Sequence, residues 1–192
     1  MNARVARSMV TLREATVEDA AFLTDLWSEL LRRADVSDQI GDLETVIKNA
    51  AESTEERLVV AEYDGEVAGG VFLKIGTITP LNLTPSLMVI APYVGGRFRR
   101  KGVGRALMEA AVTWAEENGI GTVSTGAGHG SRDANRYLAR LGLGAAAVLR
   151  IGSTQALRDR LTEQLPAGRR GPGYHPQRVL AARRVRRAQS HG

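Results

Sequence analysis

The residues best suited to chemistry lie in one basic segment, Arg99-Arg-Lys-Gly-Val-Gly104, which leads into an amphipathic helix. At a helix N-terminus several backbone N–H groups lack partners and the helix dipole is positive, so such a turn binds anions. Gly102 and Gly104 lack Cβ atoms, which lets phosphate oxygens approach the backbone. Five cationic side chains surround this point: Arg97, Arg99, Arg100, Lys101 and Arg105. The segment therefore predicts a site for a diphosphate.

Two other phosphate-binding loops do not fit the spacing. A Walker-type loop needs Ser or Thr directly after Gly-Lys, whereas here Lys101 precedes Gly102. The dinucleotide fingerprint needs a third glycine where Leu107 stands. The remaining alternative is a solvated basic turn, and the coincidence of five cations with two glycines at one helix start argues against it.

The elements around this segment follow from apolar spacing and turn residues. Pro92 near the end of the preceding strand removes a ladder donor, so pairing should be interrupted there. Ser153 is expected to cap the last helix. From the segment outward, we expect a strand over 86–94, a helix over 103–118, a strand over 122–125, a helix over 132–141, a strand over 145–151 and a helix to 165.

The N-terminal half supplies the rest of the sheet. Thr16 and Asp19 form a variant of the capping box at the start of a helix. Asp64-Gly65 is a two-residue hairpin turn. We expect strands over 10–13, 58–63 and 66–75, and helices over 16–34 and 39–52. The order predicts an α/β fold with a mixed, mostly antiparallel sheet of about six to seven strands and helices on both faces.

The chain is expected to have three parts: a flexible N-terminus over 1–8, one domain over 9–165 and a basic tail over 166–192. The tail holds seven arginines and no acid, so the rest of the chain carries a net −2 within the total of +5. A mobile solvated segment is the simpler interpretation of the tail. Nucleic-acid binding stays open, although Tyr174 is the tail's only Phe, Tyr or Trp.

The 192 residues include 43% hydrophobic and 24% charged residues, an ordinary globular composition. The absence of cysteine excludes thiol catalysis and Cys-ligated metals. The three histidines lack zinc-helix spacing, so we expect no protein-bound metal. Because there is no apolar run of about 18 residues and no signal peptide, we expect a cytoplasmic protein without a membrane partner. A homodimer stays open.

The segment Val94–Met108 resembles the acetyl-CoA signature of the GNAT superfamily of N-acetyltransferases. Arg99, Gly102 and Gly104 fill the core pattern of that signature. Residues 134–143 resemble the family's later helix and its closing turn, here Leu141-Gly142-Leu143. The resemblance covers roughly residues 10–150 and implies a GNAT-like acetyltransferase domain.

The resemblance implies acetyl-CoA as co-substrate and a primary amine, most simply a small molecule, as acceptor. The backbone of Tyr93 and Val94 would bind the pantetheine arm and the thioester carbonyl, and a backbone amide would hold the oxyanion. The amides of the signature would hold the pyrophosphate: Arg100, Lys101, Gly102, Val103, Gly104 and Arg105, with Arg99 opening the motif.

The family's acid and base are not found at their usual positions. The strand over 86–94 holds no acid, and the position of the family's tyrosine is Leu138. Tyr137 is one residue early and is interpreted as core. His129 is the candidate for proton transfer, against the alternative of a loop histidine without a role. Asn135 either touches the cofactor or bonds within its own helix.

The sequence is therefore compatible with three functions. The first is an N-acetyltransferase acting on a primary amine by direct attack. The second is a module that binds acetyl-CoA as a sensor without turnover, because the acid and base are missing. The third is an acetyltransferase whose amine is linked to RNA or protein and is recruited by the basic tail.

Overall fold

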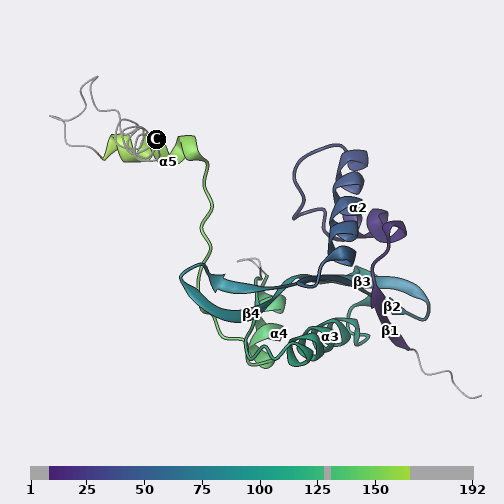
Figure 1. Ribbon diagram of the computed structural model, residues 1–192. Helices are drawn as coiled ribbons and strands as arrows, with labels where there is room; N and C mark the ends of the chain where they lie inside the picture. The colour runs from purple at the N-terminus through teal and green to yellow at the C-terminus, as the bar shows by residue number, and fades with distance from the viewer. Residues whose placement is uncertain (1–8, 128–130, 165–192) are drawn as a thin grey trace, which may run out of the picture. The chain divides into compact units, whose positions relative to one another are not determined.

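The computed structural model describes residues 9–127 and 131–164, and the chain divides into two compact units, Met1–Gly144 and Ala145–Gly192. The first unit contains a five-stranded sheet (Figure 1). In spatial order the strands are β1 (Val10–Glu14), β2 (Glu56–Tyr63), β3 (Glu66–Thr79), β4 (Asn82–Val94) and β5 (Val123–Thr125).

The sheet is mixed, as the sequence predicts. Strands β1 to β4 pair antiparallel, and β5 pairs parallel with β4. The turn between β2 and β3 has positive φ at both Asp64 (53°) and Gly65 (83°), the conformation that matches strand twist in a two-residue hairpin. A parallel pair needs a crossover, and α3 (Val103–Glu117) supplies it.

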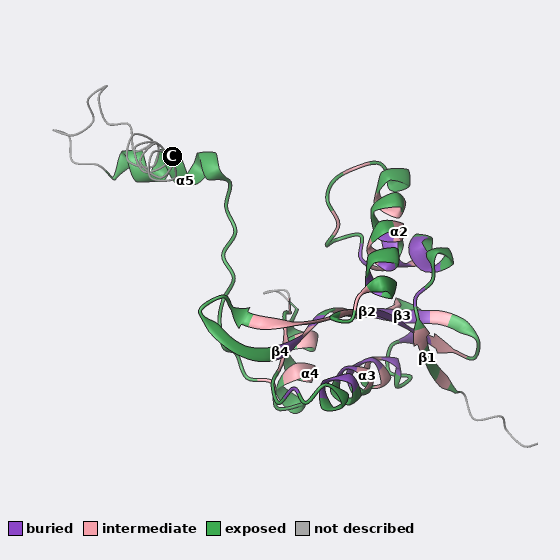
Figure 2. Cartoon of the chain, viewed as in Figure 1, coloured by how far each residue is buried: buried purple, intermediate pink, exposed green. Residues whose placement is uncertain are grey.

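Helices cover both faces of the sheet (Figure 1). α1 (Ala20–Leu26) and α2 (Val36–Glu52) pack on one face, where Leu23 and Val60 belong to one buried cluster. α3 packs on the other face, in the buried cluster that contains Leu107, which we call the α3 cluster. Figure 2 shows the buried residues gathered where these helices meet the sheet. Trp27 and Trp114 are core residues, one in each cluster.

An ion pair between the half-buried Arg13 and the buried Asp19 joins β1 to the start of α1. The capping box of Thr16 and Asp19 is formed as predicted, ahead of a 3₁₀ turn over Val17–Asp19. Arg13 donates two hydrogen bonds to the Asp19 carboxylate, at 2.7 and 2.8 Å, and a third to Glu62 of β2 at 2.6 Å. Three elements are thereby fixed to one another through a single guanidinium group.

Strands β3 and β4 continue beyond their other neighbours as a two-stranded ribbon. Lys74 is the last β3 residue paired with β2, and Leu87 is the first β4 residue paired with β5. The ribbon residues Ile78, Leu81 and Leu83 are exposed. Pro85 lies on the same exposed ribbon.

Two predictions about elements are wrong. The helix expected over 16–34 ends at Leu26, because Trp27 leaves helical geometry (φ −106°, ψ 14°) and its indole binds β4. The expected strand over 145–151 is absent, so the described residues form five strands rather than six or seven. Val148, Leu149 and Ile151 are exposed, and an apolar run without a neighbouring strand makes no ladder.

The remaining helices are α4 (Arg132–Arg140) and α5 (Thr154–Glu163). In the second unit, the Ser153 hydroxyl accepts from the Ala156 N–H at 3.1 Å, which confirms the predicted cap of α5. None of the helices in the described ranges combines the length and apolar character needed to cross a membrane.

Candidate functional site

Strand β4 lies between β3 and β5, but only β3 pairs with it up to its last residue. With β5 it shares three residue pairs, which end at Val89 opposite Thr125. The Thr125 hydroxyl donates to the Val89 carbonyl at 2.8 Å, where the two strands part. Among the described residues, Ile90–Val94 pair only with β3. We call residues 90–94 the open edge.

The open edge begins with a β-bulge. Ala91 and Pro92 together lie opposite the single β3 residue Val71, so the interruption predicted at Pro92 is confirmed. Ala91 has φ of +50°, which is uncommon for a residue other than glycine. The buried indole of Trp27 donates from Nε1 to the Ala91 carbonyl oxygen at 3.0 Å. The bulge is therefore tied to the end of α1.

The basic turn after β4 presents unpaired amides. Gly102 precedes α3 with φ of +88°, and a Cβ there would meet no atom within 4 Å, so the position requires glycine and leaves open space. The Ala106 N–H donates to the Gly102 carbonyl at 3.0 Å, closing the first turn. Earlier amides of the helix have no acceptor within it: those of Val103, Gly104 and Arg105.

The end of β4 lies against this turn. A Cβ at Gly104 would lie 3.6 Å from Cγ2 of Val94, so the first turn of α3 borders the open edge. A Cβ at Gly69 would lie 2.6 Å from the Tyr93 carbonyl oxygen, so β3 needs a glycine where Tyr93 crosses it. The fold thus brings the predicted residues of strand and turn to one end of the sheet.

Two of the five cations are held by neighbouring side chains. The Lys101 ammonium lies 4.6 Å from the centroid of the Tyr63 ring and 5.6 Å from that of Phe98. Arg97 forms an ion pair with Glu66 and stacks on Phe98 at 4.7 Å. These contacts fix the outer side of the turn to the β2–β3 hairpin.

The other three cations face solvent. Arg105 lies 3.9 Å from Glu109 one helical turn on. Arg99 and Arg100 are exposed and form no ion pair with any residue that the structure describes. Arg100 has φ of +63°, so the backbone reverses there. Two guanidinium groups beside the unpaired amides are thus available to an anion.

Helix α4 carries the remaining candidates. The Asn135 side-chain amide donates to the Ser131 carbonyl at 2.8 Å, within its own helix. Tyr137 packs against the α3 cluster, as predicted, and its buried hydroxyl has no hydrogen-bond partner among the described residues. Burial raises the pKa of Tyr137, and the nearby charges of Arg105 and Arg140 oppose that rise. His129 lies outside the described residues.

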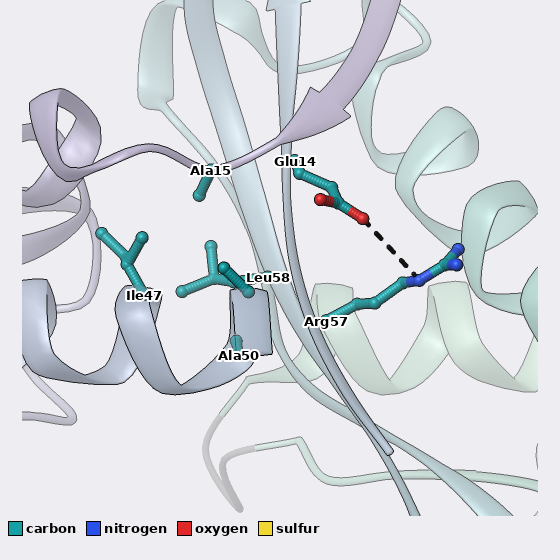
Figure 3. Close-up of a pocket in the computed structure, with 7 residues that line it drawn as sticks. Glu14, Ala15, Ile47, Ala50, Arg57 and Leu58 are labelled. Atoms are coloured by element: carbon teal, nitrogen blue, oxygen red, sulfur yellow. Dashed lines mark ion pairs between the residues drawn. The ribbon is translucent and has the colours of Figure 1, made fainter. Parts of the chain in front are cut away.

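A separate pocket lies between α2 and the adjoining ends of β1 and β2 (Figure 3). Its charged residues, Glu14 and Arg57, form an ion pair at 3.8 Å. Arg57 also stacks on Trp114 at 5.1 Å and lies 4.0 Å from Glu117, at the far end of α3. Since α3 rises about 1.5 Å per residue, the pocket is roughly 20 Å from the basic turn. It is not part of the candidate site.

The sequence predicts the basic turn but gives no signal for two contacts around the open edge. Neither the Trp27 bond to Ala91 nor the Thr125 bond to Val89 has a local signal, because their partners are 64 and 36 residues apart. The only hint was the Ala-Pro pair, which indicated a break in pairing without its geometry. No group of three His, Asp or Glu side chains in the described ranges is placed to hold a metal.

Comparison with known proteins matches this chain to one family and to several solved structures. The model of the acetyltransferase (GNAT) family matches residues 21–143. A solved aminoglycoside N-acetyltransferase in complex with CoA aligns with a TM-score of 0.65 at 14% identity, over 80% of this chain and 99% of that one. A transcriptional regulator from Bacillus halodurans aligns with a TM-score of 0.65 at 21% identity, over 76% and 100%.

A predicted acetyltransferase with acetyl-CoA from Clostridium acetobutylicum aligns with a TM-score of 0.59 at 15% identity, over 77% of this chain and 98% of that one. A comparison with curated protein sequences finds no match. At these identities the solved structures establish the fold, while the family model spans more than half of the chain. The chain therefore belongs to the acetyltransferase (GNAT) family, the GNAT-type N-acetyltransferases that its sequence resembles.

Proposed function

We propose that the chain binds acetyl-CoA at the basic turn and transfers the acetyl group to a primary amine. The observation that carries this proposal is the set of unpaired amides in the first turn of α3, which directly follows the left-handed Gly102 and borders the open edge of β4. The amides and the flanking arginines suit a pyrophosphate, and the unpaired strand suits the amide groups of a pantetheine arm. The solved relative that contains CoA supports this choice of co-substrate.

The reaction we propose is direct attack. The amine nitrogen bonds to the thioester carbon, the C–S bond breaks, CoA leaves as thiolate and the nitrogen loses a proton. A free alkyl amine has a pKa near ~10.4, so the acceptor must lose its proton before attack. A thiol near pKa ~8.5 leaves readily, which makes a dedicated acid less necessary than for an alkoxide. His129 remains our candidate for proton transfer.

The test of the binding step is Gly102→Glu. At this position any side chain must adopt positive φ, and a carboxylate would stand where the phosphates are proposed to bind. We expect the dissociation constant for CoA, measured by calorimetry, to rise at least tenfold.

The matched control is Gly119→Glu at the other end of α3. Gly119 also has positive φ (65°) and open space, so the change imposes the same strain and the same charge. CoA affinity should stay within twofold of the parent. Equal affinities in parent and Gly102→Glu would refute the proposed site.

A sensor that binds acetyl-CoA without turnover is the second candidate. The observation that favours it is the lack of any acid along β4 and the presence of Leu138 at the position of the family's tyrosine. Thiol release from acetyl-CoA over a panel of primary amines separates the two functions. A sensor binds CoA and releases none above the rate without protein.

A further inference from the structure

The direction of each backbone group on β4 follows from the ladder on either side of the bulge. After the bulge, the Gly95 N–H donates to the Ala68 carbonyl at 2.9 Å, so Gly95 faces β3. Successive residues of an antiparallel strand face opposite sides, so the Tyr93 N–H also faces β3 and the Val94 N–H faces away. Tyr93 is therefore poorly oriented to serve a ligand at the open edge with its N–H.

Before the bulge, the alternation points Ala91 outward. The Leu87 N–H donates to the Thr122 carbonyl at 2.9 Å, and the Val89 carbonyl accepts from Thr125, so both residues face β5. Two residues further on, the Ala91 N–H continues this series, but β5 pairing has ended at Val89. Beyond the β5 pairing, the Ala91 N–H is the first one on that side of β4, and it has no strand partner among the described residues. Pro92 has no N–H to offer.

The Ala91 peptide is held by one side chain from another element. Its carbonyl accepts the Trp27 indole N–H at 3.0 Å, and the Trp27 side chain is buried between α1 and the sheet. The left-handed φ of +50° is unfavourable for alanine, so this conformation needs an external restraint. The indole bond supplies that restraint, and no other hydrogen bond to Ala91 O is formed within the described residues.

We propose that Trp27 is a positioning residue for acetyl transfer: by binding the Ala91 carbonyl, it fixes the bulge so that the Ala91 N–H faces the thioester oxygen. The proposal rests on the function proposed above. As the amine attacks, this oxygen gains negative charge, and loss of one aimed donor costs about 10²–10³ in kcat. In this role Trp27 acts only through the Ala91 carbonyl and needs no contact with the acetyl group or the phosphates.

The experiment replaces Trp27 by Phe and measures thiol release from acetyl-CoA with hydroxylamine, a small nitrogen nucleophile that needs no acceptor pocket. We expect kcat to fall at least tenfold, while KM for acetyl-CoA and the CoA dissociation constant stay within twofold. If Trp27 served only the core, its replacement would lower the unfolding midpoint without a selective fall in kcat at constant KM. Replacing Trp27 by 3-benzothienylalanine, which loses the N–H but keeps the bicyclic shape, should give the same fall in kcat.

Trp114→Phe is the matched control, because Trp114 is equally buried and lies on α3, at the opposite face of the sheet. It should lose comparable stability and keep kcat within twofold. Unchanged kcat in the benzothienyl variant, or equal losses of kcat in Trp27→Phe and Trp114→Phe, would overturn the proposal. If the parent itself fails to bind CoA, the proposed function fails first, and that outcome is distinct.

Discussion

Tyr137 illustrates how the position of one hydroxyl group separates packing from catalysis. The ring packs against the α3 cluster, while the buried hydroxyl lacks a partner among the described residues. A buried polar group without a hydrogen bond costs about 1–3 kcal/mol. The residue is one position away from Leu138, where the family resemblance would place an acid, and the geometry gives it a core role.

Tyr137→Phe should therefore stabilise the protein. The change removes only the unsatisfied hydroxyl, so we expect the free energy of unfolding in urea to rise by about 1 kcal/mol. Thiol release in the presence of amines should be unaffected. A tenfold loss of kcat in this variant would instead show that the hydroxyl takes part in the reaction.

At the level of residues, the basic turn could be predicted because its signal is local. The cations, the two glycines and the start of the helix follow one another within ten residues. The conformation of Ala91 could not be predicted, because alanine has no preference for positive φ and takes it here in a bulge bonded to a distant tryptophan. His129 stays a prediction, since it lies outside the described residues.

Among the elements, the junction of β1, α1 and β2 has the clearest electrostatic character. Burial by itself raises the pKa of Asp19, but the hydrogen bonds from Arg13 and from the Thr16 backbone outweigh it, and the net pKa is lowered. A carboxylate with a lowered folded pKa adds stability above its unfolded pKa, near ~3.9, and this stability is lost as pH falls through the folded value.

We expect the unfolding free energy to be constant through neutral pH and to decline below about pH 4. Asp19→Asn should lower it by about 2–3 kcal/mol at pH 7, because Arg13 then loses its buried partner. The same variant should lose part of the decline in acid. A variant with the parent's full acid sensitivity would show that other carboxylates are responsible.

Helices and strands with strong periodicity were predicted with nearly correct ends, and two errors have physical causes. α1 is shortened because Trp27 bonds to β4 instead of continuing the helix, so Leu30 is exposed rather than core. Residues 145–151 form a short apolar run that resembles a buried strand, but strand formation depends on a partner that the segment's own sequence does not contain. Local patterns specify faces, whereas tertiary partners decide where elements end.

For the whole molecule, charge is divided between the tail and the rest. The seven arginines of residues 166–192 leave the other residues with a net −2. Every residue proposed to bind acetyl-CoA precedes this tail. Recruitment of an amine linked to RNA or protein by the tail therefore remains a proposal separate from the chemistry.

Deleting residues 166–192 tests that separation. We expect kcat and KM with small amines to stay within twofold of the parent, because the basic turn and the open edge are left intact. Retention on RNA, measured by gel shift at low salt, should be lost if the tail is what binds it. Unchanged RNA affinity after the deletion would end the nucleic-acid hypothesis.

The short pairing between β4 and β5 determines how easily these two strands separate. Three residue pairs join these strands, whereas β3 and β4 pair along most of their length. Amide protons of β5 should accordingly exchange with deuterium through local fluctuations, while those at the centre of β3 wait for global unfolding. If acetyl-CoA binds as proposed, this local opening would admit its thioester beside β4 without disturbing the rest of the sheet.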